Sequence, residues 1–238
     1  MSHKTDQDPN DLKDDAHAAS VIPESIADGV DEDVVEPNRR LFTGWQFLLF
    51  AALAIAYSSF HLISLNVYPM ETWSFRIVHI AGALILGYGL FSGARFADDD
   101  HQASGAWIKW LSYALLIPAA YTLAQVLLMY QTLSGGAMRI DPSIENWHYG
   151  YPLMATTAAA VVLSWFYRQA RHRFNPADLV LMVCALASAG YLLVAYNTNI
   201  RMSTGTSFAP SGISWAAIAG SLLILELTRR VAGLALVV

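Results

Sequence analysis

Charged side chains are scarce in this sequence. Only 14% of its 238 residues are charged, whereas 55% are hydrophobic. A water-soluble domain of this size carries roughly a quarter charged residues. The deficit argues against an ordinary soluble fold and indicates that lipid surrounds much of the chain.

Cysteine is nearly absent as well. The single Cys184 lies within an apolar run, so the chain cannot form an internal disulfide or a Cys-based metal site. We expect a small buried residue there rather than a reactive thiol. Glycine-rich phosphate loops, nucleophile motifs and zinc-ligand spacings are missing too, so we expect no enzymatic activity, metal or cofactor. The scattered bases argue against nucleic-acid binding.

Residues 1–38 lack hydrophobic periodicity. They hold 11 of the 19 acidic residues and only Lys4 and Lys13 as bases. A signal peptide begins basic and then turns apolar, which this stretch does not. We predict a disordered, acidic cytoplasmic tail over 1–38, with solvation favoured over partner docking as its role. A transmembrane helical domain is predicted over 39–238.

Six apolar segments approach the roughly 20 residues that a membrane-spanning helix needs. They are 41–64, 74–93, 107–131, 148–167, 177–196 and a segment that starts near Ile213. Tryptophans near the segment ends are typical of interfacial belts, and Pro118 predicts a kink in the third segment. The predicted fold is an all-α integral membrane protein with about six transmembrane helices.

Lysine and arginine alternate between successive connections. The connections predicted to face the cytoplasm hold most of the bases, and the others hold only Arg139 and Arg201. Because cytoplasmic loops are enriched in Lys and Arg, we predict that both termini lie in the cytoplasm. The cytoplasmic set is Arg39, Arg40, Arg95, Lys109, Arg168, Arg171, Arg173, Arg229 and Arg230.

Few ionisable residues lie at membrane depth. Arg76 and His79 share one helical face at the outer boundary. They are either an anchor or contact site, or Arg76 simply snorkels to the interface while His79 forms a hydrogen bond. His61 lies at a similar depth. His61 and His79 are therefore alternative axial haem ligands, although histidines at a helix boundary more often serve hydrogen bonding.

Charged residues occur again near the end of the last apolar segment, which starts near Ile213. Glu226 precedes Arg229 by three residues and Arg230 by four, the favourable order for helical ion pairs. These residues lie roughly 21–27 Å of helix rise beyond Ile213, which places them at the inner membrane boundary. We therefore predict that they anchor the helix at the cytoplasmic side. The apolar stretch 231–238 is too short to cross a bilayer, and we expect it to pack on a partner protein.

Two parts of the chain resemble a transporter family. "ADLVLMVCALASAGYLLVAYN" followed by "LLILELTRRVAGLAL" resembles tripartite ATP-independent periplasmic (TRAP) transporter permeases, closest to the branch that works with TAXI-type binding proteins. "SSFHLISLNVYP" and "FRIVHIAGALILGYGLF" resemble the first two helices of the family, with Arg76 and His79 at its Arg-x-x-His positions. The matching residues of the later part are Asp178, Leu179, Leu225, Glu226, Thr228, Arg229, Arg230, Gly233, Ala235 and Leu236.

The resemblance implies a small, non-catalytic Q-type scaffold subunit in the bacterial inner membrane. A large M-type permease subunit would hold the substrate and sodium sites and move as an elevator. A periplasmic TAXI-type protein would deliver organic acids for sodium-coupled uptake. From the predicted topology alone, we expect the outer loops 132–147 and 197–211 to face the periplasm and help to receive it. Structural or docking roles, and no substrate contact, are implied for Arg76, His79, Glu226, Arg229 and Arg230.

The chain departs from the family in two ways. The family's small subunit usually has four spanning helices, so 107–167 would insert two more, and His61 stands where Gln is common. Independently of the resemblance, the middle of the predicted membrane segments is nearly free of charge, which favours a scaffold over a transport path. The alternatives are a six-helix b-type cytochrome that uses His61 and His79, and a lipid-acting enzyme, for which no convincing polar cluster occurs.

Overall fold

Helices make up nearly all of the regular structure. The computed structural model of the protein describes residues 38–96, 104–195 and 210–233. Within those ranges there is no strand, only an isolated antiparallel β-bridge between Arg39 and Phe91, so the all-α prediction is confirmed. The helices are α3 (Gly44–Asn66), α4 (Thr72–Leu90), α5 (Ala106–Ala114), α6 (Leu116–Ser134), η2 (Ile144–Gly150), α7 (Tyr151–Phe166), α8 (Pro176–Ala195) and α10 (Ser211–Ala232).

Five helical stretches are long and apolar enough to cross a membrane. They are Gly44–Asn66, Thr72–Leu90, Ala106–Ser134, Pro176–Ala195 and Ser211–Ala232. The remaining predicted segment, 148–167, contains the shorter α7. The π-helical η2 precedes α7 without a break in the helical backbone, since Gly150 and Tyr151 both keep right-handed helical dihedrals. The five helices suggest a multi-pass membrane protein, as the composition predicts.

Pro118 interrupts the third predicted segment. α5 ends at Ala114 and α6 begins at Leu116. Proline has no backbone N–H and its ring clashes with the carbonyl four residues earlier, which here belongs to Ala114. The regular pattern resumes when the Ala119 N–H donates to the Leu115 carbonyl at 3.2 Å. Pro118 therefore coincides with a one-residue interruption of the helix at Leu115.

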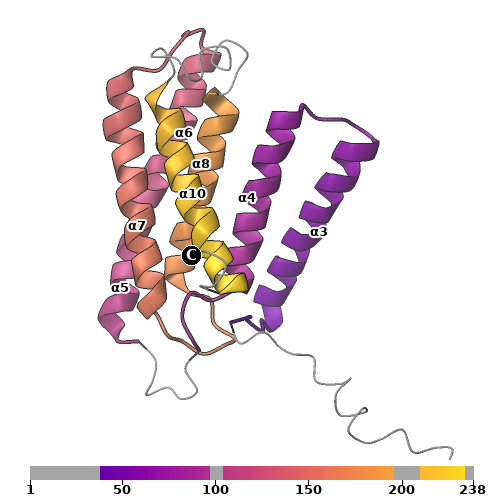
Figure 1. Cartoon of the computed structure of the whole chain (residues 1–238), viewed down its shortest axis with the longest axis vertical. Helices are drawn as coiled ribbons and strands as arrows, with labels where there is room; N and C mark the ends of the chain where they lie inside the picture. The colour runs from indigo at the N-terminus through magenta and orange to yellow at the C-terminus, as the bar shows by residue number, and fades with distance from the viewer. Residues whose placement is uncertain (1–37, 97–103, 196–209, 234–238) are drawn as a thin grey trace, which may run out of the picture. The chain divides into compact units, whose positions relative to one another are not determined.

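α8 is the central helix. Within its most apolar membrane window, 56% of the residues are buried, compared with 11% for α3. α8 packs against α4, α6, α7 and α10, whereas α3 packs mainly on α4 (Figure 1). Small side chains let neighbouring helices approach closely, and the "ALASAG" stretch supplies buried Ala185, Ala187 and Ser188. Cys184 is buried beside them, as predicted.

The helices run alternately in opposite directions (Figure 1). The starts of α3, α5 and α8 therefore meet the ends of α4, α7 and α10 at one end, which we call the basic end. Of the bases in the described ranges, only Arg76 and Arg139 belong to the opposite end. The others are Arg39, Arg40, Arg95, Lys109, Arg168, Arg171, Arg173, Arg229 and Arg230.

Three sequence predictions fall wholly or largely outside the described ranges. The acidic tail predicted over 1–38 lies almost entirely beyond them, and so does most of the loop 197–211. Of the apolar stretch 231–238, only the first three residues are described. α10 ends at Ala232, and Gly233 follows with a φ of 80°, a positive value that glycine adopts at little cost.

Candidate functional site

Asp178 is a fully buried carboxylate at the basic end. Asn175 is the N-cap of α8, because its Oδ1 accepts a hydrogen bond from the Ala177 N–H at 2.8 Å. Pro176 occupies the first helical position, where the missing N–H costs nothing. The helix dipole favours a negative charge in the first turn, where Asp178 lies. The local sequence therefore places a buried acid at a helix start.

Asp178 is shared between two arginines from distant parts of the chain. Its Oδ2 accepts a hydrogen bond from Nη2 of Arg40, which precedes α3, and its Oδ1 accepts one from Nη1 of Arg230 at 2.7 Å. All three side chains have no solvent exposure. A buried charge is costly unless it is paired and hydrogen-bonded, so each of these groups depends on the others.

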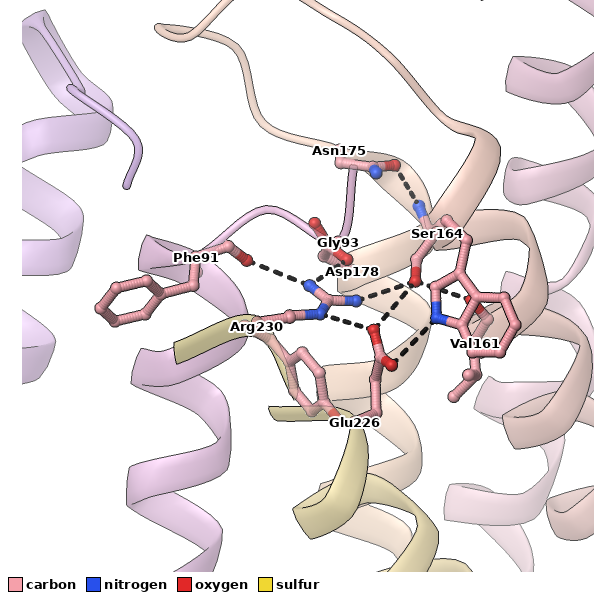
Figure 2. Close-up of polar contacts among 12 residues, drawn as sticks. Phe91, Gly93, Val161, Ser164, Asn175, Asp178, Glu226 and Arg230 are labelled. Atoms are coloured by element: carbon pink, nitrogen blue, oxygen red, sulfur yellow. Dashed lines mark hydrogen bonds and ion pairs between the residues drawn. The ribbon is translucent and has the colours of Figure 1, made fainter. Parts of the chain in front are cut away.

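Arg230 joins four helices through one guanidinium. Its Nε donates to Glu226 Oε1 at 2.8 Å, and its Nη2 donates to Ser164 Oγ at 2.9 Å (Figure 2). Its Nη1 also donates to the Phe91 carbonyl at 3.0 Å, and its Cζ lies 4.7 Å from the centre of the Tyr88 ring. Together with Asp178, these contacts connect the end of α10 with α4, α7 and the start of α8.

Glu226 accepts from a second arginine and from an indole. Arg229 donates to both of its carboxylate oxygens, each at 2.8 Å, and Trp165 Nε1 donates to Oε2 at 3.0 Å. Arg229 also donates from Nη2 to the Gly93 carbonyl at 3.0 Å. The ion pairing predicted from the spacing of Glu226, Arg229 and Arg230 is therefore present.

Arg40 closes the cluster against the end of α4. Its Nη1 donates to the carbonyls of Tyr88 and Gly89, both at 2.9 Å. These carbonyls belong to the last turn of a helix, where no intrahelical donor remains. Burial lowers the pKa of Arg40, and the Asp178 carboxylate opposes that shift. Arg40 thus combines the roles of helix cap and ion-pair partner.

We call Arg40, Asp178, Glu226, Arg229 and Arg230 the ionic cluster. Three bases and two acids leave a net charge of about +1 if every group keeps its usual charge at neutral pH. Their polar atoms are directed mainly at one another and at backbone carbonyls. The arrangement connects the ends of α4, α7 and α10 with the start of α8.

Sequence reasoning found only part of this cluster. Glu226, Arg229 and Arg230 were predicted as structural or docking residues, but Arg40 was interpreted only as a topological signal. Asp178 was noted only as a residue shared with the TRAP family. The signal that could have identified it is an aspartate that directly follows "NPA" and opens an otherwise apolar helix, because such a buried acid needs a basic partner.

Arg76, His79 and His61 lie apart from the ionic cluster, at the opposite end. Arg76 is exposed and lies over the Trp73 ring, 5.5 Å from its centre. His61 Nε2 and His79 Nδ1 are 2.7 Å apart. His61 Nδ1 donates to the Tyr57 carbonyl at 2.7 Å, and the Tyr57 hydroxyl lies 2.9 Å from His79 Nδ1. This arrangement is a hydrogen-bonded histidine pair.

In the observed conformation, His61 and His79 are not positioned to ligate a haem from its two sides. Two axial ligands stand on opposite sides of the metal, so their nitrogens are roughly 4 Å apart for metal–nitrogen bonds of about 2 Å. The nitrogens of His61 and His79 contact each other directly instead, with ring planes at 82°. Haem ligation by these residues stays a prediction that the geometry does not favour.

A second buried acid lies in η2 and was not predicted. Glu145 is 2% exposed and accepts from the Tyr191 hydroxyl at 2.6 Å and from Ser211 Oγ at 3.1 Å. The Gly212 N–H approaches the same carboxylate at 3.4 Å. In the described ranges no base contacts it. Glu145 thus joins η2, α8 and α10 at the end opposite the ionic cluster.

The comparisons with known proteins add no family to this geometry. No protein-family model, curated protein or solved structure matches the chain. Within the described ranges, no group of three or more His, Cys, Asp or Glu residues is arranged to hold a metal ion.

The Gly93→Ala variant tests the close packing of the ionic cluster. A Cβ on Gly93 would lie 2.8 Å from Ser164 Oγ and 3.0 Å from Arg230 Nη2, so we expect a loss of about 1–3 kcal/mol in stability. Thermal unfolding in detergent measures it. Gly220→Ala is the matched control, because it meets nothing within 4 Å and should be neutral or stabilising in a helix. Equal effects of the two substitutions would contradict the packing.

Proposed function

We propose that the chain is the small Q-type scaffold subunit of a TRAP-type secondary transporter. The observation that carries the proposal is the ionic cluster. Asp178, Glu226, Arg229 and Arg230 are four of the residues that match the family pattern, and in the fold all four belong to the ionic cluster. This common location supports treating the matched segments as one structural unit rather than as two chance similarities.

The placement of buried charge supports a static role. Among the described residues, the buried ionisable groups of opposite sign lie in the ionic cluster at one end, and Glu145 lies at the other. A subunit that moves an anion or sodium through its interior breaks helices, or buries charge, near mid-membrane. α8 and α10 are continuous helices, and no ionisable side chain of the described residues is buried at the interruption between α5 and α6. The chain is suited to support a moving partner.

The proposal includes a topology. The chain crosses the bacterial inner membrane six times, with η2 and α7 together providing the fourth crossing. The basic end faces the cytoplasm, because cytoplasmic loops carry the excess of Lys and Arg. The partners are a large M-type permease subunit, which carries the substrate and sodium sites, and a periplasmic TAXI-type binding protein that delivers an organic acid.

α3 offers a surface on which such a partner or lipid can lie. Leu48, Ile55 and Leu62 are each between 65% and 67% exposed, and the helix packs mainly on α4. Large exposed apolar surfaces mark protein or membrane contacts. The proposal predicts that the M-type subunit covers part of the apolar surface of this chain.

Co-purification and transport test the proposal together. The tagged chain, extracted from its native membrane in mild detergent, should bring a multi-spanning permease in near-equal amounts, as measured by mass spectrometry. That complex, reconstituted into vesicles with its binding protein, should accumulate an organic acid only under an inward sodium gradient. An unrelated tagged membrane protein is the control. A preparation that contains the chain alone, or one with a haem Soret band, would count against the scaffold function.

A further inference from the structure

Three cations that form no ion pair with another described residue border a depression at the basic end. Lys109, Arg168 and Arg173 are exposed, and they border a hollow of about 520 Å³ between the starts of α3, α5 and α8 and the chain that follows α7. We call this hollow the basic basin. Its lining contains no carboxylate; the remaining lining residues are Trp45, Gln46, Ser104, Tyr113, Tyr167, Gln169, Phe174, Pro176 and Leu179.

The cations of the basic basin are not used by the fold. Within the described ranges, the ion pairs involve Arg40, Arg229 and Arg230, and none involves the three basin residues. Tyr167 and Gln169, which also line the basin, are buried, and Gln169 Nε2 donates to the Arg173 carbonyl at 2.7 Å. Three positive charges in a lining that holds no carboxylate among the described residues favour an anion in a partly enclosed site.

An apolar groove opens from the same wall. It has a volume of about 350 Å³, lies between α3, α4 and α8, and shares Trp45, Gln46, Phe174 and Leu179 with the basic basin. We call it the apolar groove. The rest of its lining is apolar; these residues are Leu49, Phe50, Leu53, Ile85, Met182, Val183 and Leu186.

The length and direction of the groove suit an acyl chain. Along α3, its lining runs from Trp45 to Leu53, which is roughly 12 Å of helix rise. One leaflet contributes about half of the roughly 30 Å hydrocarbon core. A second apolar hollow continues the path towards Phe60 and shares Ile85 and Leu186 with the groove. The path therefore leads from the charged surface into the depth of the membrane.

We propose that the basic basin and the apolar groove together bind one anionic phospholipid. Lys109, Arg168 and Arg173 hold its phosphate, and an acyl chain follows the groove between α3 and α8. Basic pockets between transmembrane helices on the cytoplasmic side suit anionic headgroups. A free anion would leave the groove unexplained, and an apolar partner helix would leave the three cations unpaired. A lipid with an anionic head satisfies both surfaces.

Native mass spectrometry of the full chain in detergent tests this proposal with dioleoyl phosphatidylglycerol and dioleoyl phosphatidylcholine as probes. We expect tighter binding of phosphatidylglycerol. The double variant Lys109→Gln, Arg173→Gln should weaken it at least about tenfold, because each basic residue near an anionic surface contributes roughly fivefold. Arg76→Gln, Arg95→Gln is the matched control, since it removes the same charge outside the basin and should leave the affinity unchanged.

The groove has its own test. Leu53→Trp adds bulk to the groove wall and should weaken the binding of phosphatidylglycerol while thermal unfolding stays near the parent value. Equal affinities for the two lipids, or equal losses in the basin and control variants, would overturn the proposal. So would inorganic phosphate that binds as tightly as the lipid. Loss of phosphatidylglycerol from a co-purified protein complex would show that a protein occupies the groove, and would overturn it as well.

Discussion

Asp178→Asn should destabilise the protein by about 3–5 kcal/mol, the usual cost of leaving buried charges without their partner. Asparagine has nearly the same shape as aspartate but no charge. Arg40 and Arg230 would then approach the same site with no carboxylate between them, although both are fully buried. The substitution therefore removes little packing and much electrostatic stabilisation.

Thermal unfolding in detergent measures the effect, and Asp141→Asn is the matched control. Asp141 is exposed, and its Oδ1 accepts the Ser143 N–H at 2.8 Å, a bond that asparagine also makes. We expect little change in the control. Combined with Arg40→Gln, Asp178→Asn should cost less than the sum of the two single changes, because they remove one shared interaction. Additive losses would show that Arg40 and Asp178 do not depend on each other.

Arg230→Lys should cost about 2–4 kcal/mol although it keeps the positive charge. Arg230 donates from three nitrogens to groups in different directions, including Glu226, Asp178 and the Phe91 carbonyl. A lysine ammonium is a single point that cannot reproduce a planar guanidinium. The buried acceptors left without a donor would each cost about 1–3 kcal/mol, with partial relief from rearrangement.

Arg229→Lys is the control for that variant, measured by the same unfolding assay. Arg229 is 22% exposed at its side chain and reaches only Glu226 and the Gly93 carbonyl with its hydrogen bonds. Water can replace part of what a partly exposed ion pair loses. We expect about 1 kcal/mol or less. If both lysine variants lost the same stability, the planar guanidinium geometry of Arg230 would not explain its contribution to the stability of the fold.

The helices and their alternating direction could be predicted from the sequence because both depend on local composition. Apolar runs of sufficient length mark spanning helices, Pro118 marks the break between α5 and α6, and the distribution of bases groups the same helix ends that meet at the basic end. The pairing of Glu226 with Arg229 and Arg230 was equally local, since a helix places residues three and four apart on one side.

The rest of the ionic cluster could not be predicted because it depends on tertiary packing. Arg40 and Asp178 are 138 residues apart, and no local sequence pattern around either residue indicates that the two form a pair. Likewise, η2 differs from an α-helix only in its hydrogen-bond spacing, which apolar periodicity does not reveal. The sequence therefore placed Glu145 in an outer loop over 132–147, whereas the structure begins a helix at Ile144 and buries that side chain.

The order of the ionic cluster along the chain has a consequence for biosynthesis. Arg40 and Asp178 come from earlier parts of the chain, and Arg230 follows Asp178 by 52 residues. Synthesis proceeds from the N-terminus at about 5–20 residues per second, so Asp178 waits several seconds with one of its two arginines before α10 can arrive. Until α10 has been made, Asp178 can pair with only one of its two arginines, so the charge balance of the ionic cluster is completed last.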